Sequence, residues 1–197
     1  MITIIDYGAG NLASVRKAFA YLGCVTQITS DPDTVARAQR LVLPGVGNFR
    51  ATAQLEANGM RAAIDEAVRR GVPFLGICLG MQWLFEGSEE APDVAGLGAF
   101  PGRCARFPAA VKAPHVGWNE VSPCAASRLF ADGESAFVYY THSYRAPLGP
   151  GAVACTDYGG AFTAAVERGN IFGVQFHPEK SDAAGLALLR RFLEAPC

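Results

Sequence analysis

The chain has 197 residues, half of them hydrophobic, so it is long enough to bury a sizeable core. Its 17 basic and 18 acidic side chains give a formal net charge of −1, and no run of one sign stands out along the chain. This balance disfavours a nucleic acid or an anionic membrane as the main partner.

The N-terminal residues and the cysteines predict a cytoplasmic protein. The chain starts with a short apolar segment, without the charged leader and longer apolar region of a signal peptide. No stretch approaches the ~18 apolar residues that span a bilayer. The six cysteines are widely and irregularly spaced, with no CxxC or CxxH pair. We therefore expect reduced thiols and no metal site.

The first 85 residues alternate between strand-like and helix-like segments. Nearly continuous apolar runs predict strands at 2–5, 25–29, 41–43 and 74–77. Helical spacing of apolar residues, together with capping and stop residues, predicts helices at 12–22, 32–39, 60–70 and 80–85. The alternation, with short connections, predicts an α/β fold whose central, mostly parallel sheet is flanked by helices.

The second half of the chain has a different pattern. Short β-rich runs separated by prolines and glycines predict antiparallel or mixed strands at 137–141, 153–156, 162–166 and 171–176. A final amphipathic helix is predicted at 183–194. We see no internal repeat, low-complexity tract or linker, and we expect one domain over residues 1–197.

A cysteine stands where the fourth predicted strand meets the next helix. In the stretch Gly76-Ile77-Cys78-Leu79-Gly80 the glycines flank it at two residues on either side. This is the pattern of a nucleophile elbow, in which small residues let the chain pass close to itself. The helix start favours a thiolate, and the Leu79 N–H is well placed to bind an oxyanion. Taken alone, the pentapeptide fits a nucleophile and a buried structural cysteine equally well.

A cysteine nucleophile needs a base, and this chain has only three histidines. His177 stands at the end of a predicted strand and is followed by Pro178 and Glu179. In an extended segment residues i and i+2 point to the same side, so Glu179 is placed to orient the imidazole. Taken alone, these residues also fit a strand-end histidine beside an exposed glutamate, or half of a metal site.

A glycine-containing turn follows the third predicted strand. Pro44-Gly45-Val46-Gly47 lies at the carboxyl end of that strand, the edge where α/β sheets bind ligands. Its N–H groups provide a second candidate oxyanion donor, although by itself the segment is better explained as an ordinary turn.

Together these segments resemble the class I, triad-type glutamine amidotransferases. The family's nucleophile motif G-x-C-x-G-x-Q matches Gly76, Cys78, Gly80 and Gln82, and its late H-P-E motif matches 177–179. Further segments resemble one subfamily, the glutaminase subunits of imidazole glycerol phosphate synthases. These segments are 6–12, 43–49, 115–119, 139–144 and 177–181. The resemblance covers essentially the whole chain.

The resemblance implies a mechanism and a set of site residues. A cysteine thiolate attacks the amide of glutamine, the histidine protonates the departing ammonia, and water hydrolyses the resulting thioester without a cofactor. The implied catalytic residues are Cys78, His177 and Glu179. The implied oxyanion donors are Leu79, Gly45, Val46 and Gly47. The implied glutamine-binding residues are Gln82, Ser143 and Tyr144, for which a solvent-facing Gln82 and plain strand structure at 143–144 are the alternatives.

The resemblance also implies a partner. In the family, a (β/α)₈-barrel cyclase subunit forms a heterodimer with the glutaminase and takes up the ammonia. The cyclase converts a phosphoribulosyl-formimino carboxamide nucleotide into imidazole glycerol phosphate and an aminoimidazole carboxamide nucleotide, in histidine biosynthesis. Asn11, Trp118 and Lys180 are candidate docking residues because they lie in the subfamily's segments. Core packing of Trp118 and a solvated Lys180 are the alternatives.

Three other functions compete with this one. A glutaminase subunit of an anthranilate or pyridoxal phosphate synthase shares the chemistry but not the segments 115–119 and 177–181. A catalytically silent regulatory module has no need of the intact Cys78, His177 and Glu179. A cysteine peptidase on a related scaffold shares the elbow but not the late H-P-E.

Overall fold

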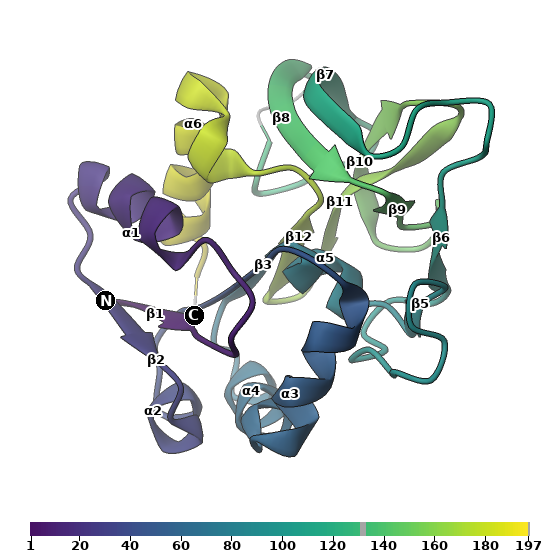
Figure 1. Cartoon of the computed structure of the whole chain (residues 1–197). Coiled ribbons are helices and arrows are strands. Elements are labelled where there is room, and N and C mark those ends of the chain that lie inside the picture. The colour runs from purple at the N-terminus through teal and green to yellow at the C-terminus, as the bar shows by residue number, and fades with distance from the viewer. Residues whose placement is uncertain (131–132, 197) are drawn as a thin grey trace.

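The computed structural model describes residues 1–130 and 133–196. It is built on a nine-stranded sheet with the order β2-β1-β3-β4-β12-β11-β10-β7-β8 (Figure 1). The first five strands in this order are mutually parallel, and the remaining neighbours are antiparallel. The predicted fold class, a mostly parallel α/β sheet with antiparallel strands from the second half of the chain, is confirmed.

The parallel strands agree closely with the sequence predictions. Their bounds are β1 Ile2–Ile5, β2 Thr26–Thr29, β3 Leu41–Gly45, β4 Phe74–Cys78 and β12 Ile171–Val174. All of these except β2, which is the edge strand, are buried along their whole length. Burial on both faces explains why their sequences read as continuous apolar runs.

The antiparallel half contains a strand that the sequence did not predict. The four strands of this half are β7 His115–Pro123, β8 Ala136–His142, β10 Ala152–Asp157 and β11 Ala161–Arg168. The strand that was not predicted is β7. Strand β7 escaped prediction because its exposed positions alternate with partly buried polar ones rather than with apolar ones. A second, three-stranded sheet contains β5 Gly87–Ser88, β6 Arg103–Arg106 and β9 Tyr144–Arg145.

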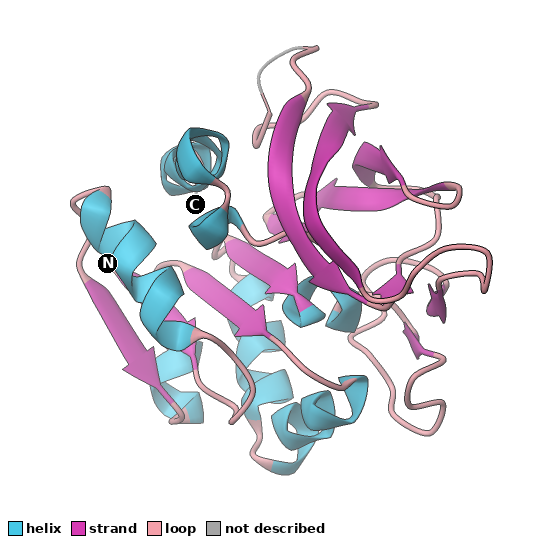
Figure 2. Cartoon of the chain, turned by 45° about the horizontal axis from the view of Figure 1, so that its top comes forward, coloured by secondary structure: helices cyan, strands magenta, loops and turns pink. Residues whose placement is uncertain are grey.

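Helices cover both faces of the parallel strands (Figure 2). Their bounds are α1 Leu12–Tyr21, α2 Pro32–Ala36, α3 Ala53–Ala57, α4 Met60–Arg69, α5 Leu79–Trp83 and α6 Asp182–Glu194. Two 3₁₀ turns, η1 Phe49–Thr52 and η2 Pro178–Lys180, complete the set. The helix predicted to reach residue 39 ends at Ala36, because the chain must turn to enter β3 at Leu41.

Alternate residues of the central strands build two separate cores. Ile4 and Leu75 face one core, which α1 and α6 cover, whereas their neighbours Ile5 and Phe74 face the other, which α2, α3 and α4 cover. This is the two-residue period of a β-strand, expressed on a sheet with both faces buried. The carboxyl ends of the central strands are thereby held between two packed helix layers.

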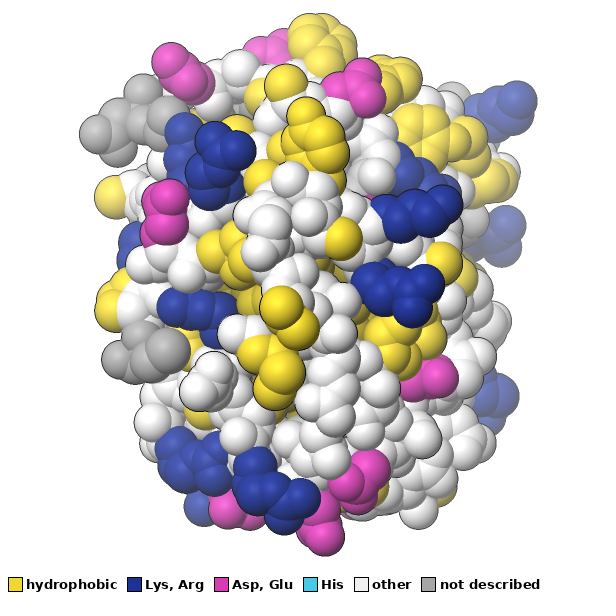
Figure 3. Space-filling model, turned by 90° about the vertical axis from the view of Figure 1, so that its left-hand side faces the viewer, with side chains coloured by type: hydrophobic (Ala, Val, Ile, Leu, Met, Phe, Trp, Pro, Cys, Tyr) yellow, Lys and Arg dark blue, Asp and Glu magenta, His cyan; other side chains and the backbone are white. Residues whose placement is uncertain are grey.

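Surface charge is mixed on the face that lies at the left of Figure 1. Basic and acidic side chains both scatter over it, with small apolar areas between them (Figure 3). Such a face does not present the concentrated positive charge that a polyanion requires. Among residues 1–130 and 133–196, no helix is both long enough and apolar enough to cross a bilayer.

Close backbone packing explains the glycines around Cys78. A Cβ on Gly76 would lie 2.5 Å from the Gly80 carbonyl oxygen, and a Cβ on Gly80 would overlap the Leu43 carbonyl oxygen of the neighbouring strand. Neither glycine has a positive φ. These glycines are therefore required by the contact between α5, β4 and β3 rather than by their own backbone angles.

We expect Gly80→Ala to lower the free energy of unfolding by about 2–3 kcal/mol or more, because backbone must move to admit the methyl group. Urea denaturation measures this change. The matched control is Gly149→Ala, where an added Cβ meets nothing within 4 Å. Equal unfolding midpoints for the two variants would show that the contact is not tight.

Candidate active site

Cys78 occupies a strained turn at the carboxyl end of a central strand. It is the last residue of β4 and precedes the first residue of α5, with φ 54° and ψ −107°. A positive φ in a residue other than glycine costs of order 1–3 kcal/mol and persists only where the surrounding structure enforces it. The side chain is 5% exposed, so the turn presents a largely buried thiol.

His177 and Glu179 form a buried pair beside this turn. His177 follows β12, which is paired in parallel with β4 through Val174 and Ile77. The His177 Nδ1 and Glu179 Oε1 atoms are 2.8 Å apart, and both side chains are almost completely buried. The two residues meet across the 3₁₀ turn η2 rather than along an extended segment, so the reason given from sequence for their pairing is wrong.

The charges around His177 favour its protonated form. Burial alone lowers its pKa, but the charge of the nearby Cys78 sulfur, together with the hydrogen bond and charge of Glu179, raises the pKa to about 10. The other ring nitrogen, Nε2, is buried without a hydrogen-bond partner among the described residues. The arrangement thus supports a protonated imidazole beside the Cys78 sulfur, with the Nε2–H left for a reacting group.

A cleft of about 180 Å³ opens beside Cys78. It brings together many of the residues singled out from the sequence, and these are Gly47, Cys78, Leu79, Gln82, Ser143 and Tyr144. Glu90, Pro114, Thr141 and His142 complete its wall. Gly45 and Val46 are not in that wall: Gly45 pairs with Cys78 in the sheet register, and Val46 is 38% exposed.

Gln82 is held by a chain of amide hydrogen bonds. It is 4% exposed, so the alternative of a solvent-facing side chain is wrong. Its Nε2 donates to the Tyr144 carbonyl at 3.0 Å and to Gln175 Oε1 at 3.1 Å. Gln175 in turn directs its own Nε2 toward Cys78 Sγ at 3.6 Å. Sequence analysis missed Gln175, although a glutamine inside an apolar strand run just before H-P-E was a usable signal.

Two buried histidines fix the other side of the cleft. His142 Nδ1 lies 2.8 Å from the Tyr144 carbonyl, which can only accept, so this nitrogen carries the proton. His142 Nε2 then accepts from His115 Nδ1 at 3.2 Å, and His115 Nε2 accepts from the Asn119 amide at 3.4 Å. Burial lowers the pKa of His115 to about 4 and that of His142 to about 3. Both are neutral at physiological pH and act as structural groups.

Glu90 and Tyr7 are further residues that sequence analysis missed. The Glu90 carboxylate accepts the Phe49 N–H at 2.7 Å and is the acidic group of the cleft wall. The Tyr7 hydroxyl lies against the Cα of Gly45 and has no hydrogen-bond partner among the described residues. Burial, and then the negative charge of Cys78, raise the pKa of Tyr7. Tyr7 lies in the resemblance segment 6–12 but was given no role there, and no local pattern marked Glu90, because each contact joins distant parts of the chain.

The three candidate docking residues have different environments. Trp118 is 49% exposed, which rules out core packing, and its ring meets the ring of Tyr139 edge-on at 6.2 Å. The Lys180 ammonium lies over the same ring, 5.7 Å from its centroid. Asn11 instead caps α1, where its side chain accepts the Ser14 N–H at 3.3 Å. The structure therefore brings Trp118 and Lys180 together around Tyr139 and gives Asn11 a structural role of its own.

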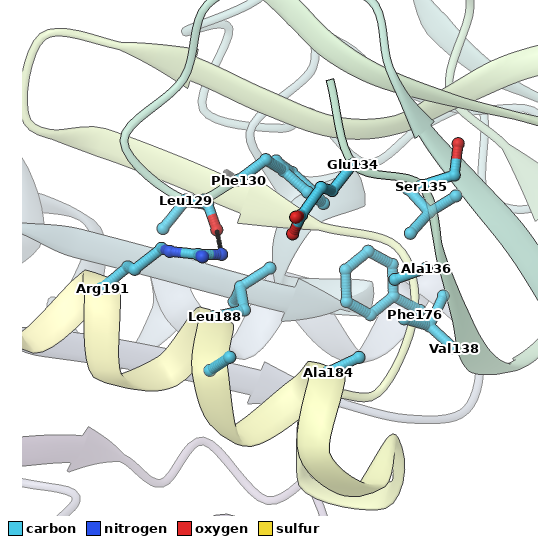
Figure 4. A pocket seen from close by; sticks show the side chains of 12 residues that line it. Leu129, Phe130, Glu134, Ser135, Ala136, Val138, Phe176, Ala184, Leu188 and Arg191 are labelled. Carbon is cyan, nitrogen blue, oxygen red and sulfur yellow. Dashed lines mark hydrogen bonds between the residues drawn. The ribbon is translucent and has the colours of Figure 1, made fainter. Parts of the chain in front are cut away.

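A second cavity, of about 150 Å³, lies apart from this chemistry. It is lined by α6, β8 and residues 129–130 and 134–135, and its walls are mostly apolar (Figure 4). Glu134 and Arg191 reach it, and Arg191 donates to the Leu129 carbonyl at 3.3 Å. Neither a cysteine nor a histidine is among the described residues that line it, so the cleft at Cys78 is the candidate active site. The described residues also contain no group of three or more His, Cys, Asp or Glu side chains placed to hold a metal ion.

Comparisons with known proteins identify the family of this chain. The family model for glutamine amidotransferase class-I matches residues 3–195. Proteins named imidazole glycerol phosphate synthase subunit HisH are similar over nearly the whole chain. The protein from Salinibacter ruber is 46% identical, covering 100% of this chain and 95% of the relative. The one from Methanothermobacter thermautotrophicus is 48% identical, covering 98% of each.

Solved structures show the same fold at lower identity. A crystal structure of a glutamine amidotransferase superposes with a TM-score of 0.78 at 19% identity, covering 98% of both chains. A chain in the structure of PurLQS from Thermotoga maritima superposes with a TM-score of 0.77 at 18% identity, covering 98% of this chain and 97% of that one. With the family model matched over almost its entire length, this chain belongs to the class-I glutamine amidotransferases.

Proposed function

We propose that this chain is the glutaminase subunit of an imidazole glycerol phosphate synthase. The observation that carries the chemistry is the buried His177–Glu179 pair, 2.8 Å apart, at the same sheet edge as the strained Cys78 turn. The names of relatives that are 46–49% identical over nearly the whole chain support the choice of synthase over the anthranilate and pyridoxal phosphate types.

The reaction begins with attack of the Cys78 sulfur on the side-chain amide carbon of glutamine. The resulting tetrahedral oxyanion accepts the Leu79 N–H at the start of α5 and N–H groups of the 45–47 turn. His177 donates its proton to the departing nitrogen, which leaves as ammonia with a glutamyl thioester behind it. His177 then takes a proton from water, which attacks the thioester and releases glutamate. Glu179 orients the imidazole through Nδ1.

Glutamine is held by the walls of the cleft. Gln82, whose amide nitrogen is already engaged by Tyr144 and Gln175, presents its oxygen to the substrate amide. The 143–144 backbone forms the facing wall. Glu90 is the acidic group of the cleft, and we assign it to the α-ammonium of glutamine, because an opposite charge at hydrogen-bond distance gives a strong and directional contact.

The ammonia is passed to a cyclase subunit in a cytoplasmic heterodimer. A docking surface consisting of Trp118, Tyr139 and Lys180 is the proposed contact, because a half-exposed tryptophan beside a cation over an aromatic ring is typical of interface anchors. It lies close to the catalytic pair, since the Tyr139 carbonyl accepts the His177 N–H at 2.9 Å. Residues 1–197 serve as one domain in this assembly.

We expect ammonia release from glutamine to be slow for the chain alone and fast when the cyclase, together with its nucleotide ligand, is added. Cys78→Ala should lower the stimulated rate at least ~10³-fold, because no other thiol lines the cleft. A coupled glutamate assay measures both. The control is Cys24→Ala, since Cys24 lies outside the cleft. Full activity of Cys78→Ala would exclude the thioester mechanism.

His177 should stay protonated well above neutral pH. ¹⁵N NMR of histidine-labelled protein should show one imidazole titrating near pH 10, whereas His115 and His142 are already neutral above about pH 5. In Cys78→Ala/Glu179→Gln both groups that raise this pKa are lost, and the remaining burial should move the midpoint below its ordinary value of 6.5.

The same shift predicts how stability changes with pH. Because the folded-state pKa of His177 is raised, its stabilising contribution is complete below pH 6.5 and is lost as the pH rises toward about 10. The wild type should therefore lose stability relative to the double variant across this range. Parallel stability curves, or an unchanged NMR midpoint in the double variant, would contradict the proposed ion pairs.

Gln175 is proposed to position the Cys78 sulfur. Gln175→Glu places a carboxylate 3.6 Å from that atom, where it disfavours a thiolate. We expect kcat/KM to fall ~10–100-fold and the pH at which iodoacetamide alkylation of Cys78 is half-maximal to rise. Gln27→Glu, the same change on the exposed edge strand β2, is the control. An unaltered alkylation profile would assign Gln175 a purely structural role.

A further inference from the structure

Two cysteines that the proposed chemistry does not use lie side by side on the antiparallel half of the sheet. Cys124 directly follows β7, and Cys155 is in the middle of β10. The two strands are antiparallel neighbours, with Ser122 opposite Cys155. The Cys124 and Cys155 sulfur atoms are 3.3 Å apart although 31 positions separate the residues in sequence.

The backbone holds these sulfurs in place. The Cys124 N–H donates to the Val153 carbonyl at 2.9 Å, which extends the β7–β10 ladder past the last residue of β7. Strand β10 shifts register against its other neighbour, β11, on both sides of Ala154. This irregularity lies next to Cys155, and a bulge of this kind re-aims the side chains near it. The proximity of the sulfurs is therefore a property of the sheet and does not depend on a flexible loop.

The pair is open to reagents and unequal in its chemistry. Cys124 is exposed, and Cys155 is partly buried. Burial, the hydrogen bond to Cys124 and the charge of Cys124 raise the pKa of Cys155 to about 12. Cys155 therefore remains a thiol, and its S–H donates to the Cys124 sulfur. The exposed Cys124 is therefore the sulfur that a disulfide in solution reaches first, and a thiolate is the form in which a cysteine attacks a disulfide.

We propose that Cys124 and Cys155 form a reversible thiol–disulfide exchange site whose co-substrate is a low-molecular-weight disulfide. The Cys124 thiolate attacks one sulfur of that disulfide, and one small thiolate leaves. The Cys155 thiol then gives up its proton and attacks the Cys124 sulfur of the mixed disulfide, which releases the second small thiol. One disulfide bond is broken and one is formed, and the protein loses two hydrogens while the small disulfide gains them.

The geometry makes the second step intramolecular. The sulfurs must approach by about 1.3 Å to reach the ~2.05 Å of a disulfide bond, a movement within the range of side-chain rotation. The product cross-links the end of β7 to β10. It lies at the end of β7 opposite to His115, roughly 25–30 Å away at ~3.3 Å per residue. Oxidation therefore adds a covalent cross-link between two strands of the sheet, at a place remote from Cys78.

The test uses the whole chain incubated with oxidised glutathione, followed by proteolysis without reduction and mass spectrometry. The experiment is run on the wild type and on Cys78→Ser, because a thiol at the elbow also reacts with disulfides. We expect a Cys124–Cys155 cross-linked peptide that dithiothreitol cleaves. In Cys124→Ser and in Cys155→Ser the cross-link should be absent, whereas Cys24→Ser should retain it.

Stability supplies an independent readout. Oxidation should raise the Tm of the wild type and of Cys24→Ser by at least about 3 °C. The disulfide closes a loop between Cys124 and Cys155, which are 31 positions apart, and so restricts the unfolded chain. The Tm of Cys124→Ser should not rise. The proposal is overturned by separate glutathione adducts on both cysteines without a cross-link, by disulfide-linked dimers, or by a cross-link between other cysteines. It is also overturned by an equal Tm rise in Cys124→Ser.

Discussion

The contact between the β4–α5 turn and the end of β3 is the constraint on which the rest of the site depends. Helix α5 begins one residue after Cys78, and its second residue lies against the Leu43 carbonyl so closely that only glycine fits. The contact forces the chain to reverse within one residue, which gives Cys78 its positive φ. It also places the Leu79 N–H and the 45–47 turn side by side, because Gly45 and Cys78 are register partners. The proposed nucleophile and the proposed oxyanion donors are thus positioned by one packing contact.

The second requirement is a protonated imidazole in a place where burial opposes it. Desolvation lowers the pKa of His177, and only the combined effect of the sulfur and the carboxylate reverses this. The parallel pairing of β12 with β4 supplies the sulfur, and the 3₁₀ turn after His177 supplies Glu179. Each member of the trio is thus delivered by a different physical means: backbone strain, strand register and a local turn.

The grouping of the three residues of the proposed triad was predictable from sequence because each part carries a local signal. The flanking glycines mark the elbow around Cys78, and the H-P-E tripeptide marks His177 and Glu179. The surroundings were not predictable in the same way. Gln82 reads as a first-turn polar residue, and only its contacts with Tyr144 and Gln175, 62 and 93 positions away, explain its burial. Strand β7 was missed because its partly buried positions include Gly117 and Asn119 instead of apolar side chains.

The same difference between local and distant signals decides which parts of the fold were predictable from the sequence. The parallel strands were recognised because burial on both faces leaves an uninterrupted apolar run. The ends of helices and the antiparallel register depend on contacts that no short window contains. The helix after Asp31 ends early because β3 begins at Leu41, and the Cys124–Cys155 proximity arises only when β7 pairs with β10. No spacing in the sequence distinguishes those two cysteines from the others.

The two halves of the sheet divide the work of the site between them. The parallel half supplies the proposed reacting groups, and the antiparallel half supplies part of the cleft wall and the proposed docking surface of Trp118, Tyr139 and Lys180. A directed chain of hydrogen bonds joins the halves, from Asn119 through His115 and His142 to the Tyr144 carbonyl. That carbonyl also accepts from Gln82. Both histidines are neutral, so each ring nitrogen is fixed as either a donor or an acceptor. This series of hydrogen bonds therefore holds Tyr144 in one position. Asn119 and Trp118 are consecutive on β7, so a partner that moves this strand acts on the group that holds Gln82. Strand β7 therefore links the proposed docking surface to the residues proposed to bind glutamine.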